Sequence, residues 1–400
     1  MPSAISSNNL YSNTIQDALN VQTQWSVAET QQASGLQAPD FGTLGGSSTR
    51  ETLNLETDIS QAQNWAGVAK TTGSTTQAMY NSIGDMNSAV VKLQQLISQA
   101  MSSPNNSDLL QQAQVIQASL QSDTNEQVGG VYLFAGSNTS LQPVDLTHYP
   151  TINATTGAYD SQTADTGYYR GDQTLLNVQV NLQQSVTYGV LASNPAIEEA
   201  MRSVQSVISA AQVSSIGTAT AASPTAATAA GGTLTVNGQS FTIAGGQSMD
   251  QIAASINSQA GGSGVTAKAV IDTAGNYHIQ LSNGMNAMTV VDSAGLGLSS
   301  ASPLSTGALV GSLQQSLTIA NKAEVALGNL QENISNTSNQ LQAANQQQTS
   351  FVSYLQNSLS GVKDADTAQA AAKVQQYQTQ LQASFLAVST LSKLSLAQFL

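Results

Sequence analysis

Lys363-Asp364-Ala365-Asp366 is the densest group of charged residues in this sequence, and two of its members could do chemistry. Carboxylates two residues apart could hold a metal ion or act as a general acid and base. On a helix, residues i and i+2 point in different directions, so such a pair shares a site only in a loop. Acidic residues are favoured at the positive end of a helix dipole, and we therefore expect this group to cap the last helix.

Other combinations of reactive side chains are sparse. The chain has no cysteine, which excludes disulfides, thiol catalysis and thiolate metal sites. Its two histidines, His148 and His278, are far apart in sequence and are expected to be ordinary polar surface residues. No G-x-S-x-G segment occurs, and the glycine pairs lack the spacing and the lysine of a phosphate-binding loop. We expect no enzymatic activity, no metal site and no cofactor.

The composition excludes several classes of partner. Of 400 residues only 8% are charged, and 10 Lys and Arg against 23 Asp and Glu give a net charge of −13. Binding to nucleic acid requires basic patches that neutralise phosphates, and an anionic membrane surface also attracts basic residues, so neither is expected as a partner. The sequence has no apolar stretch long enough to cross a membrane and no secretory signal at its N-terminus. A chain of this length predicts two or more domains.

Sequence near both ends predicts long helices. One is expected from about Arg50 to Met101, a second restarts near Ser107, and a third is expected from about Thr306 to Leu359. Apolar residues follow steps of three and four in these stretches, which is the pattern of a coiled coil or a bundle helix. The matching patterns predict that the ends pair into a rod, with the middle inserted into it. The expected rod core is Met79, Ile83, Met86, Val90, Leu93, Ile97, Leu313, Leu327, Ile334 and Leu341.

The middle of the chain predicts strands and turns. VYLFAG after Gly129-Gly130, then YYRGD, LLNVQVNL and SVTYGVLA, are expected to form short strands, and AIEEAMRSVQSVISAAQ a helix. Residues 232–292 predict a ββαββ unit, in which Asn237-Gly238 suits a type I′ hairpin turn. Ser248 and Gln251 are placed to form a capping box at the start of its helix. The predicted fold class is therefore mainly α with an inserted α+β part.

The C-terminal stretch SFLAVSTLSKLSLAQFL, residues 384–400, is the most apolar part of the chain. On a helical wheel Leu391 and Leu394 lie opposite a second apolar side, which consists of Phe385, Val388, Leu396, Phe399 and Leu400. A helix that is apolar nearly all round must be buried. The N-terminal segment is its obvious partner within the chain, but a pair of helices cannot cover both sides. We therefore expect other subunits to cover the rest, although a small bundle within one chain remains an alternative.

The expected self-assembly surface combines apolar residues of both terminal segments. Its members are Leu10, Tyr11, Ile15, Leu19, Trp25, Phe385, Leu386, Val388, Leu391, Leu394, Leu396, Phe399 and Leu400. Full burial of each Leu or Phe stabilises by roughly 1.5–3 kcal/mol, so assembly could order ends that are disordered in a free monomer.

Three segments, in the same order along the chain, carry a resemblance to a known family. They are ISSNNLYSNTIQDALNVQTQ with QQASGLQAPDF near the N-terminus, NEQVGGVYLFAGSNTSLQPV, and the C-terminal VKDADTAQAAAKVQQYQTQLQASFLAVSTLSKLSLAQFL. Together they resemble the flagellin superfamily, and within it the family of hook–filament junction proteins (hook-associated protein 3). The ββαββ unit resembles the inserted module called the flagellin hook IN motif.

The resemblance implies a structural protein of the bacterial flagellum. Such a protein is exported unfolded by the flagellar type III apparatus, with an export chaperone and without a cleaved signal, and it acts outside the cell. The implied partners are further copies of the chain in a ring, hook-associated protein 1 and flagellin. The expected domains are terminal helices ordered on assembly (1–42 and 362–400), a helical rod (43–140 and 306–361), an inserted α+β domain (141–216), and a linker with the ββαββ module (217–305).

Two alternatives remain open at this point. A filament flagellin is the first, but the C-terminal LSKLSLAQFL and the YLFAG segment favour the junction family. The second is a secreted carbohydrate-binding module within residues 141–300, where Tyr149, Tyr159, Tyr168 and Tyr169 could make a stacking surface for sugars.

Overall fold

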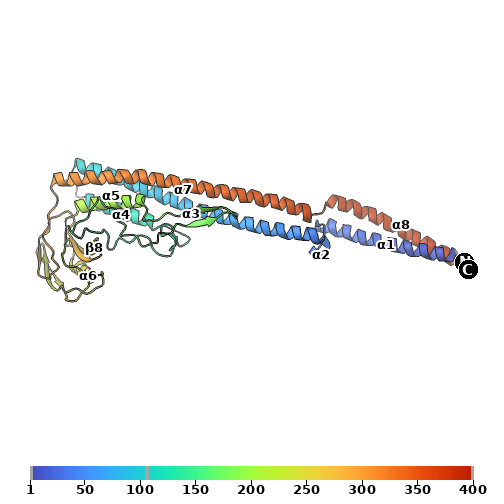
Figure 1. Cartoon of the computed structure of the whole chain (residues 1–400), viewed down its shortest axis with the longest axis horizontal. Helices are drawn as coiled ribbons and strands as arrows, with labels where there is room; N and C mark the ends of the chain where they lie inside the picture. The colour runs from blue at the N-terminus through green and yellow to red at the C-terminus, as the bar shows by residue number, and fades with distance from the viewer. Residues whose placement is uncertain (1–2, 104–107, 398–400) are drawn as a thin grey trace. The chain divides into compact units, whose positions relative to one another are not determined.

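The computed structural model describes the backbone of residues 3–103 and 108–397 and the side chains of residues 9–103 and 108–393. The chain is mainly α-helical, with long helices near both ends and small antiparallel sheets in the middle (Figure 1), so the predicted fold class is confirmed. The helices are α1 (Ser3–Ser34), α2 (Phe41–Leu44), α3 (Gly46–Ser102), α4 (Leu109–Thr124), α5 (Pro195–Ala211), α6 (Met249–Gln259), α7 (Thr306–Lys363) and α8 (Thr367–Ala397).

The strands are short and fall into four antiparallel sheets with the orders β1-β2, β3-β4, β10-β6-β7 and β5-β9-β8. Their bounds are β1 (Gln127–Val128), β2 (Val131–Tyr132), β3 (Asn177–Gln179), β4 (Ser185–Thr187), β5 (Ser214–Ile216), β6 (Gly232–Val236), β7 (Gln239–Ile243), β8 (Thr266–Ile271), β9 (Tyr277–Ser282) and β10 (Val290–Asp292).

The chain divides into two compact units, one formed by Met1–Gly67 with Ala344–Leu400 and the other by Val68–Ala343. We call them the terminal unit and the central unit. Each of α3 and α7 contributes residues to both.

In the central unit, one core lies among α3, α4, α5 and α7. The apolar residues of α3 at steps of four and three are buried there, and Leu341 of α7 is also fully buried. Phe134 and Tyr168 bring the irregular segments beside these helices into the same core. The members of the expected rod core that belong to this buried cluster are Met79, Ile83, Met86, Val90, Leu93, Ile97, Leu313, Leu327 and Ile334.

A second core of the central unit lies within residues 213–301, which we call the β module. Asn237 and Gly238 both have positive φ at the turn between β6 and β7, as a type I′ hairpin requires, and the Ser248–Gln251 capping box is present. Helix α6 packs against β7, β8 and β9, and Phe241 is fully buried. Strand β5, which precedes the predicted unit, completes a sheet with β9 through pairs from Ser214↔Ser282 to Ile216↔Gln280.

Two predicted strands differ from the structure. YYRGD is not a strand: Tyr169 makes only an isolated bridge to Val144, and Tyr168 is instead a buried core residue. The strand at VYLFAG is limited to β2, because Leu133 and Phe134 turn into the helical core after it. In both places the aromatic residues predicted a strand because such residues are common in strands. Their positions are instead determined by burial in the core.

Candidate functional site

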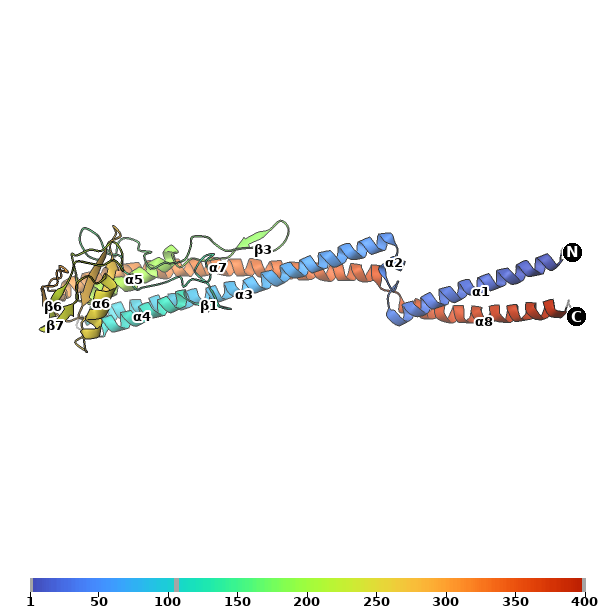
Figure 2. The same ribbon diagram turned by 90° about the horizontal axis from the view of Figure 1, so that it is seen from below.

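The terminal helices α1 and α8 run antiparallel and side by side, so both ends of the described chain lie at the same end of the pair (Figure 2). Residues of α8 that are half-buried or buried recur at steps of four and three, which is the seam of a two-helix coiled coil. The seam consists of Ala370, Val374, Tyr377, Leu381, Ser384, Val388 and Leu391 on α8 and of Ala18, Val21, Trp25 and Ala28 on α1.

Small side chains dominate the buried part of this seam. Ala18, Ala28 and Ala370 are the buried apolar residues of the two helices where side chains are described. Trp25 is only half-buried, and its indole Nε1 is covered but has no hydrogen-bond partner among the described atoms. A covered donor without an acceptor costs about 1–3 kcal/mol. The pair therefore fully buries only alanines among its apolar residues, half-buries the larger seam residues, and leaves one donor without a partner among the described atoms.

Large apolar side chains lie instead on the outer faces of the pair. Leu10 and Leu19 are each 55% exposed on α1, and Phe385 and Leu386 are 62% and 69% exposed on α8. Val27, which was not predicted, adds to the α1 face at 51%. Isolated exposed apolar residues are ordinary, but several along this helix pair form an extended apolar surface.

The structure changes the grouping of the predicted interface residues. Val388 and Leu391 were placed on opposite sides, which is wrong: both are half-buried in the seam, because they occupy successive positions of the four–three pattern. Ile15 and Trp25 are half-buried too, and Tyr11 is exposed at 36%. Leu394 and Leu396 belong to α8 but their side chains are outside the described ones, and Phe399 and Leu400 lie outside the described residues.

The group from Lys363 to Asp366 lies between α7 and α8 and does cap a helix. Asp366 Oδ1 accepts hydrogen bonds from the backbone N–H groups of Ala368 and Gln369, both at 3.0 Å, at the start of α8. The carboxylate of Asp364 is used differently, since it accepts a hydrogen bond from the Ser360 hydroxyl. The two carboxylates therefore do not share a site, and the capping prediction is confirmed for Asp366.

Backbone hydrogen bonds join the two chain segments that connect the terminal helices to α3 and α7. Gln37 N donates to Lys363 O, and Ala365 N donates to Gly35 O, both at 2.8 Å. The Lys363 ammonium group lies 3.0 Å from Glu56 Oε1. The chain thus leaves α1 and α7 at the same level along the helix pair, and hydrogen bonds join the two connecting segments there. These bonds set the register of α1 against α8.

The two histidines are not the surface residues that the sequence predicted. His148 Nε2 lies 3.0 Å from Asp250 Oδ1, and its side chain is 16% exposed. His278 Nε2 lies 3.0 Å from Asp272 Oδ2, with the side chain 12% exposed. His278 Nδ1 also lies 2.9 Å from the backbone oxygen of Gly217. Each histidine therefore contacts a residue far away in sequence, His148 through Asp250 and His278 through Gly217. Among the residues that the structure describes, no group of three or more His, Asp or Glu side chains could hold a metal ion.

The tyrosines proposed for sugar stacking are largely buried. Tyr149 and Tyr168 are 3% and 0% exposed and meet edge to face, with ring centroids 5.4 Å apart. Burial raises the pKa of Tyr149 and of Tyr168 well above the usual range, because the phenolate would lose its hydration. Neither ring has a free face for a sugar.

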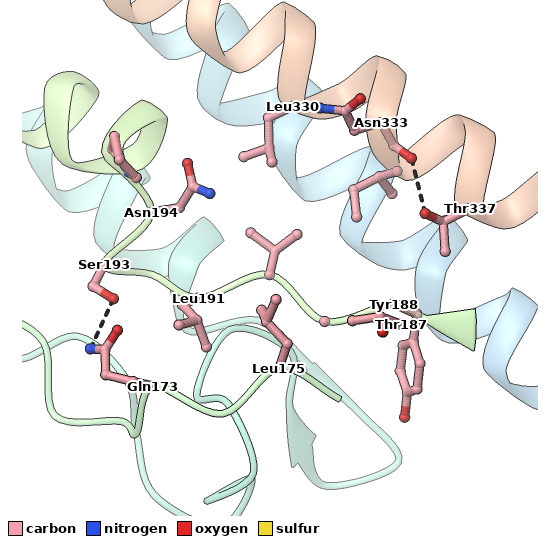
Figure 3. Close-up of a pocket in the computed structure, with 14 residues that line it drawn as sticks. Gln173, Leu175, Thr187, Tyr188, Leu191, Ser193, Asn194, Leu330, Asn333 and Thr337 are labelled. Carbon is pink, nitrogen blue, oxygen red and sulfur yellow. Dashed lines mark hydrogen bonds between the residues drawn. The ribbon is translucent and has the colours of Figure 1, made fainter. Parts of the chain in front are cut away.

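A hollow of about 440 Å³ lies between α7 and the segment around β4 in the central unit (Figure 3). Leu330 of α7 faces Leu191 and Leu175 across it, and Gln173 bonds to Ser193 at its rim. Its lining has no carboxylate, ammonium or imidazole group. The hollow is therefore lined by apolar side chains together with amide and hydroxyl groups, among them the phenol of Tyr188.

Within the described residues, no helix has a stretch that is both long enough and apolar enough to cross a membrane.

Comparisons with known proteins identify one segment by family. Residues 233–285, from β6 to just beyond β9, match the flagellin hook IN motif, as the sequence predicted for this unit. The match supports the resemblance to the flagellin superfamily. No curated protein matches the chain.

Several solved structures are similar to this chain. Flagellar hook-associated protein 3 from Legionella pneumophila is 14% identical, with 77% of this chain and 98% of that chain covered and a TM-score of 0.42. FlgL from Bacillus cereus is 10% identical, with 79% and 100% covered and a TM-score of 0.41. FlgL from Xanthomonas campestris is 15% identical, with 76% and 99% covered and a TM-score of 0.38.

Proposed function

We propose that this chain is a structural protein of the bacterial flagellum, and that it acts as a hook–filament junction protein. The observation that carries the proposal is the terminal helix pair, in which the fully buried apolar residues are alanines while Leu10, Leu19, Phe385 and Leu386 face outward. A free monomer gains little from such a pair. Copies packed side by side would bury the outer faces, and each Leu or Phe buried would add roughly 1.5–3 kcal/mol.

The sequence motifs and the IN-motif match support the flagellar setting. The C-terminal LQASFLAVSTLSKLSLAQFL and the YLFAG segment favour a junction protein over a flagellin. Residues 233–285 match the flagellin hook IN motif. We accordingly propose a ring of copies between hook-associated protein 1 and flagellin, outside the cell, reached through the flagellar type III export apparatus with an export chaperone.

The phenotype of a deletion strain tests this function. Cells that lack the chain should secrete flagellin that does not polymerise, and the full-length chain should restore filaments. Absent flagellin with an intact hook and junction would instead indicate that the chain is a filament flagellin. Filaments of normal length in the deletion strain would refute both roles.

Variants of the terminal helices test the surface itself. Removing residues 384–400, or the double change Phe385→Ser and Leu386→Ser, should leave a secreted chain that cannot complete the junction. Gln382→Ser is a matched control, because Gln382 is exposed on the same helix but polar. Full filaments with the double variant would show that the outer face of α8 is not an assembly surface.

A further inference from the structure

Two aromatic side chains in the terminal unit are exposed on a helix that is otherwise polar on its outer side. Phe351 and Tyr354 of α7 are 44% and 66% exposed. Their rings lie nearly parallel, with centroids 6.5 Å apart and an interplanar angle of 14°. Aromatic residues contribute most of the binding energy when they are buried at interfaces, so an exposed stacked pair marks a contact surface. We call Phe351 and Tyr354 the aromatic knob.

The charge distribution indicates what covers the knob. The chain has a net charge of −13, so two copies repel each other where their acidic residues meet. The α7 segment from residue 333 to residue 362 is an exception, because it has no Asp, Glu, Lys, Arg or His. A second copy can approach this neutral face without bringing like charges together. A basic partner, by contrast, would find no carboxylate there.

A shallow, open hollow lies on α3 in the same unit. It has a volume of about 570 Å³ and is lined by Leu53, Glu56, Thr57, Ser60, Gln61 and Asn64. Leu53 is 47% exposed and offers an apolar contact. The charge of Glu56 is offset by Lys363, whose Nζ is 3.0 Å from Glu56 Oε1. Since no residue of α7 lines the hollow, the knob of the same copy does not fill it.

We propose that the aromatic knob of one copy docks into the α3 hollow of the next copy. The two surfaces are different patches of one chain, so the contact is head to tail, and repetition of such a contact produces a ring or a helical array rather than a closed dimer. This inference rests on the proposed function and deepens it by naming the lateral contact between subunits.

The absence of cysteine from the chain makes the contact directly testable by disulfide cross-linking. Tyr354→Cys and Ser60→Cys are made in separate chains, expressed together in the source bacterium, and oxidised on isolated flagella. The expected result is a shift of both chains to a disulfide-linked dimer, with neither variant dimerising when expressed alone. Adding Phe351→Ser to the Tyr354→Cys chain should abolish the dimer. Val325→Cys with Ser60→Cys is the matched control, because Val325 is exposed at 64% elsewhere on α7.

Other outcomes separate this contact from the proposed function. Flagella that contain both variants without a cross-link would overturn the knob-and-hollow contact and leave the junction role intact. A dimer of Tyr354→Cys with itself would also overturn it, in favour of a symmetric contact. If the chain is absent from flagella, the junction role fails, and the same pair of variants is then oxidised as concentrated purified protein. No mixed dimer there would overturn the contact as well.

Discussion

The two compact units bury different kinds of side chain. In the central unit, large residues such as Phe134, Tyr168 and Phe241 are fully buried. In the described part of the terminal unit, the buried apolar residues are Ala18, Ala28, Ala62, Ala344, Val352, Leu355 and Ala370. Alanine buries little area, whereas exposed large residues are frequent there.

The difference teaches that the two units obtain their stability from different sources. Ordering a residue costs about 1–2 kcal/mol of backbone entropy, and only buried apolar area offsets that cost. The central unit has this area within a single chain. The terminal unit presents large residues outward, so under the proposed assembly neighbouring copies would supply much of its stabilisation. Four measurements would break or sharpen this comparison.

Phe241→Ala should have the largest effect. Phe241 is fully buried in the β module, and replacing such a residue by alanine typically costs about 3–5 kcal/mol. The measurement is amide hydrogen exchange in β6–β9, where protection should fall. Protection in α1 and α8 should not change, and a loss there would mean that the two units unfold together.

Leu355→Ala tests the terminal unit in the same way. Leu355 is 5% exposed and, with Val352, is one of two buried apolar residues larger than alanine among the described side chains of this unit. The change should cost about 2–4 kcal/mol and should increase exchange in α3 before residue 67 and in α7 after residue 344. Leu359→Ala, at a half-buried position one turn later, is the control and should cost less. Equal effects would contradict the burial assigned to Leu355.

The pH dependence of stability should reveal the cost of burying the charged Lys268 ammonium group in the β module. Lys268 Nζ donates to the backbone oxygen of Tyr149 at 2.8 Å, and burial lowers the pKa of Lys268 from 10.5 to about 8. Above pH 8 the folded chain has lost this proton while the unfolded chain still binds it. The free energy of unfolding should therefore rise with pH from about 8 to 9.5, by at most about 1.4 kcal/mol per pH unit.

Lys268→Met provides the control for this pH effect. The difference between the wild-type chain and the variant isolates the lysine, because the titrating tyrosines are the same in both. Thermal unfolding at several pH values between about 8 and 9.5 is sufficient. A difference that does not vary with pH would show that the amine is not buried in the folded chain.

Phe385→Ser should have the smallest effect on the isolated chain. The side chain is 62% exposed, and changes at such positions usually alter stability by less than about 0.5 kcal/mol. The free energy of unfolding of the purified chain provides the measurement. A loss of more than about 1 kcal/mol would place Phe385 in an intramolecular core. In that case the contrast between the two units would be smaller than the exposures indicate.

The sequence indicated most of the helical architecture because periodicity reports burial directly. Met79, Ile83 and Met86 follow the four–three pattern, and they are buried. The seam of α8 has the same pattern, from Ala370 through Val374 and beyond, but it was not recognised in the sequence. A search for large aliphatic residues does not find this seam, because alanine, serine and tyrosine occupy several of its positions.

Local patterns with their own geometry were equally informative. Asn237-Gly238 predicted a hairpin because both residues tolerate positive φ, and Ser248 with Gln251 predicted a cap because the two side chains satisfy each other's backbone N–H groups. The histidines show the limit of such reasoning. His148 and Asp250 are 102 residues apart, and no local pattern predicts that they meet.

The sequence by itself determined the long terminal helices, the IN-motif unit and the apolar character of both ends, because each of these depends on neighbours along the chain. Only the tertiary structure decided which apolar residues face inward. Val388 and Leu391 lie in the seam with α1, while Phe385 and Leu386 remain outside it. The physical reason is that a helix apolar on several sides can offer only one of them to a single partner. Which side it offers depends on the register that the Gly35–Ala365 and Gln37–Lys363 hydrogen bonds impose.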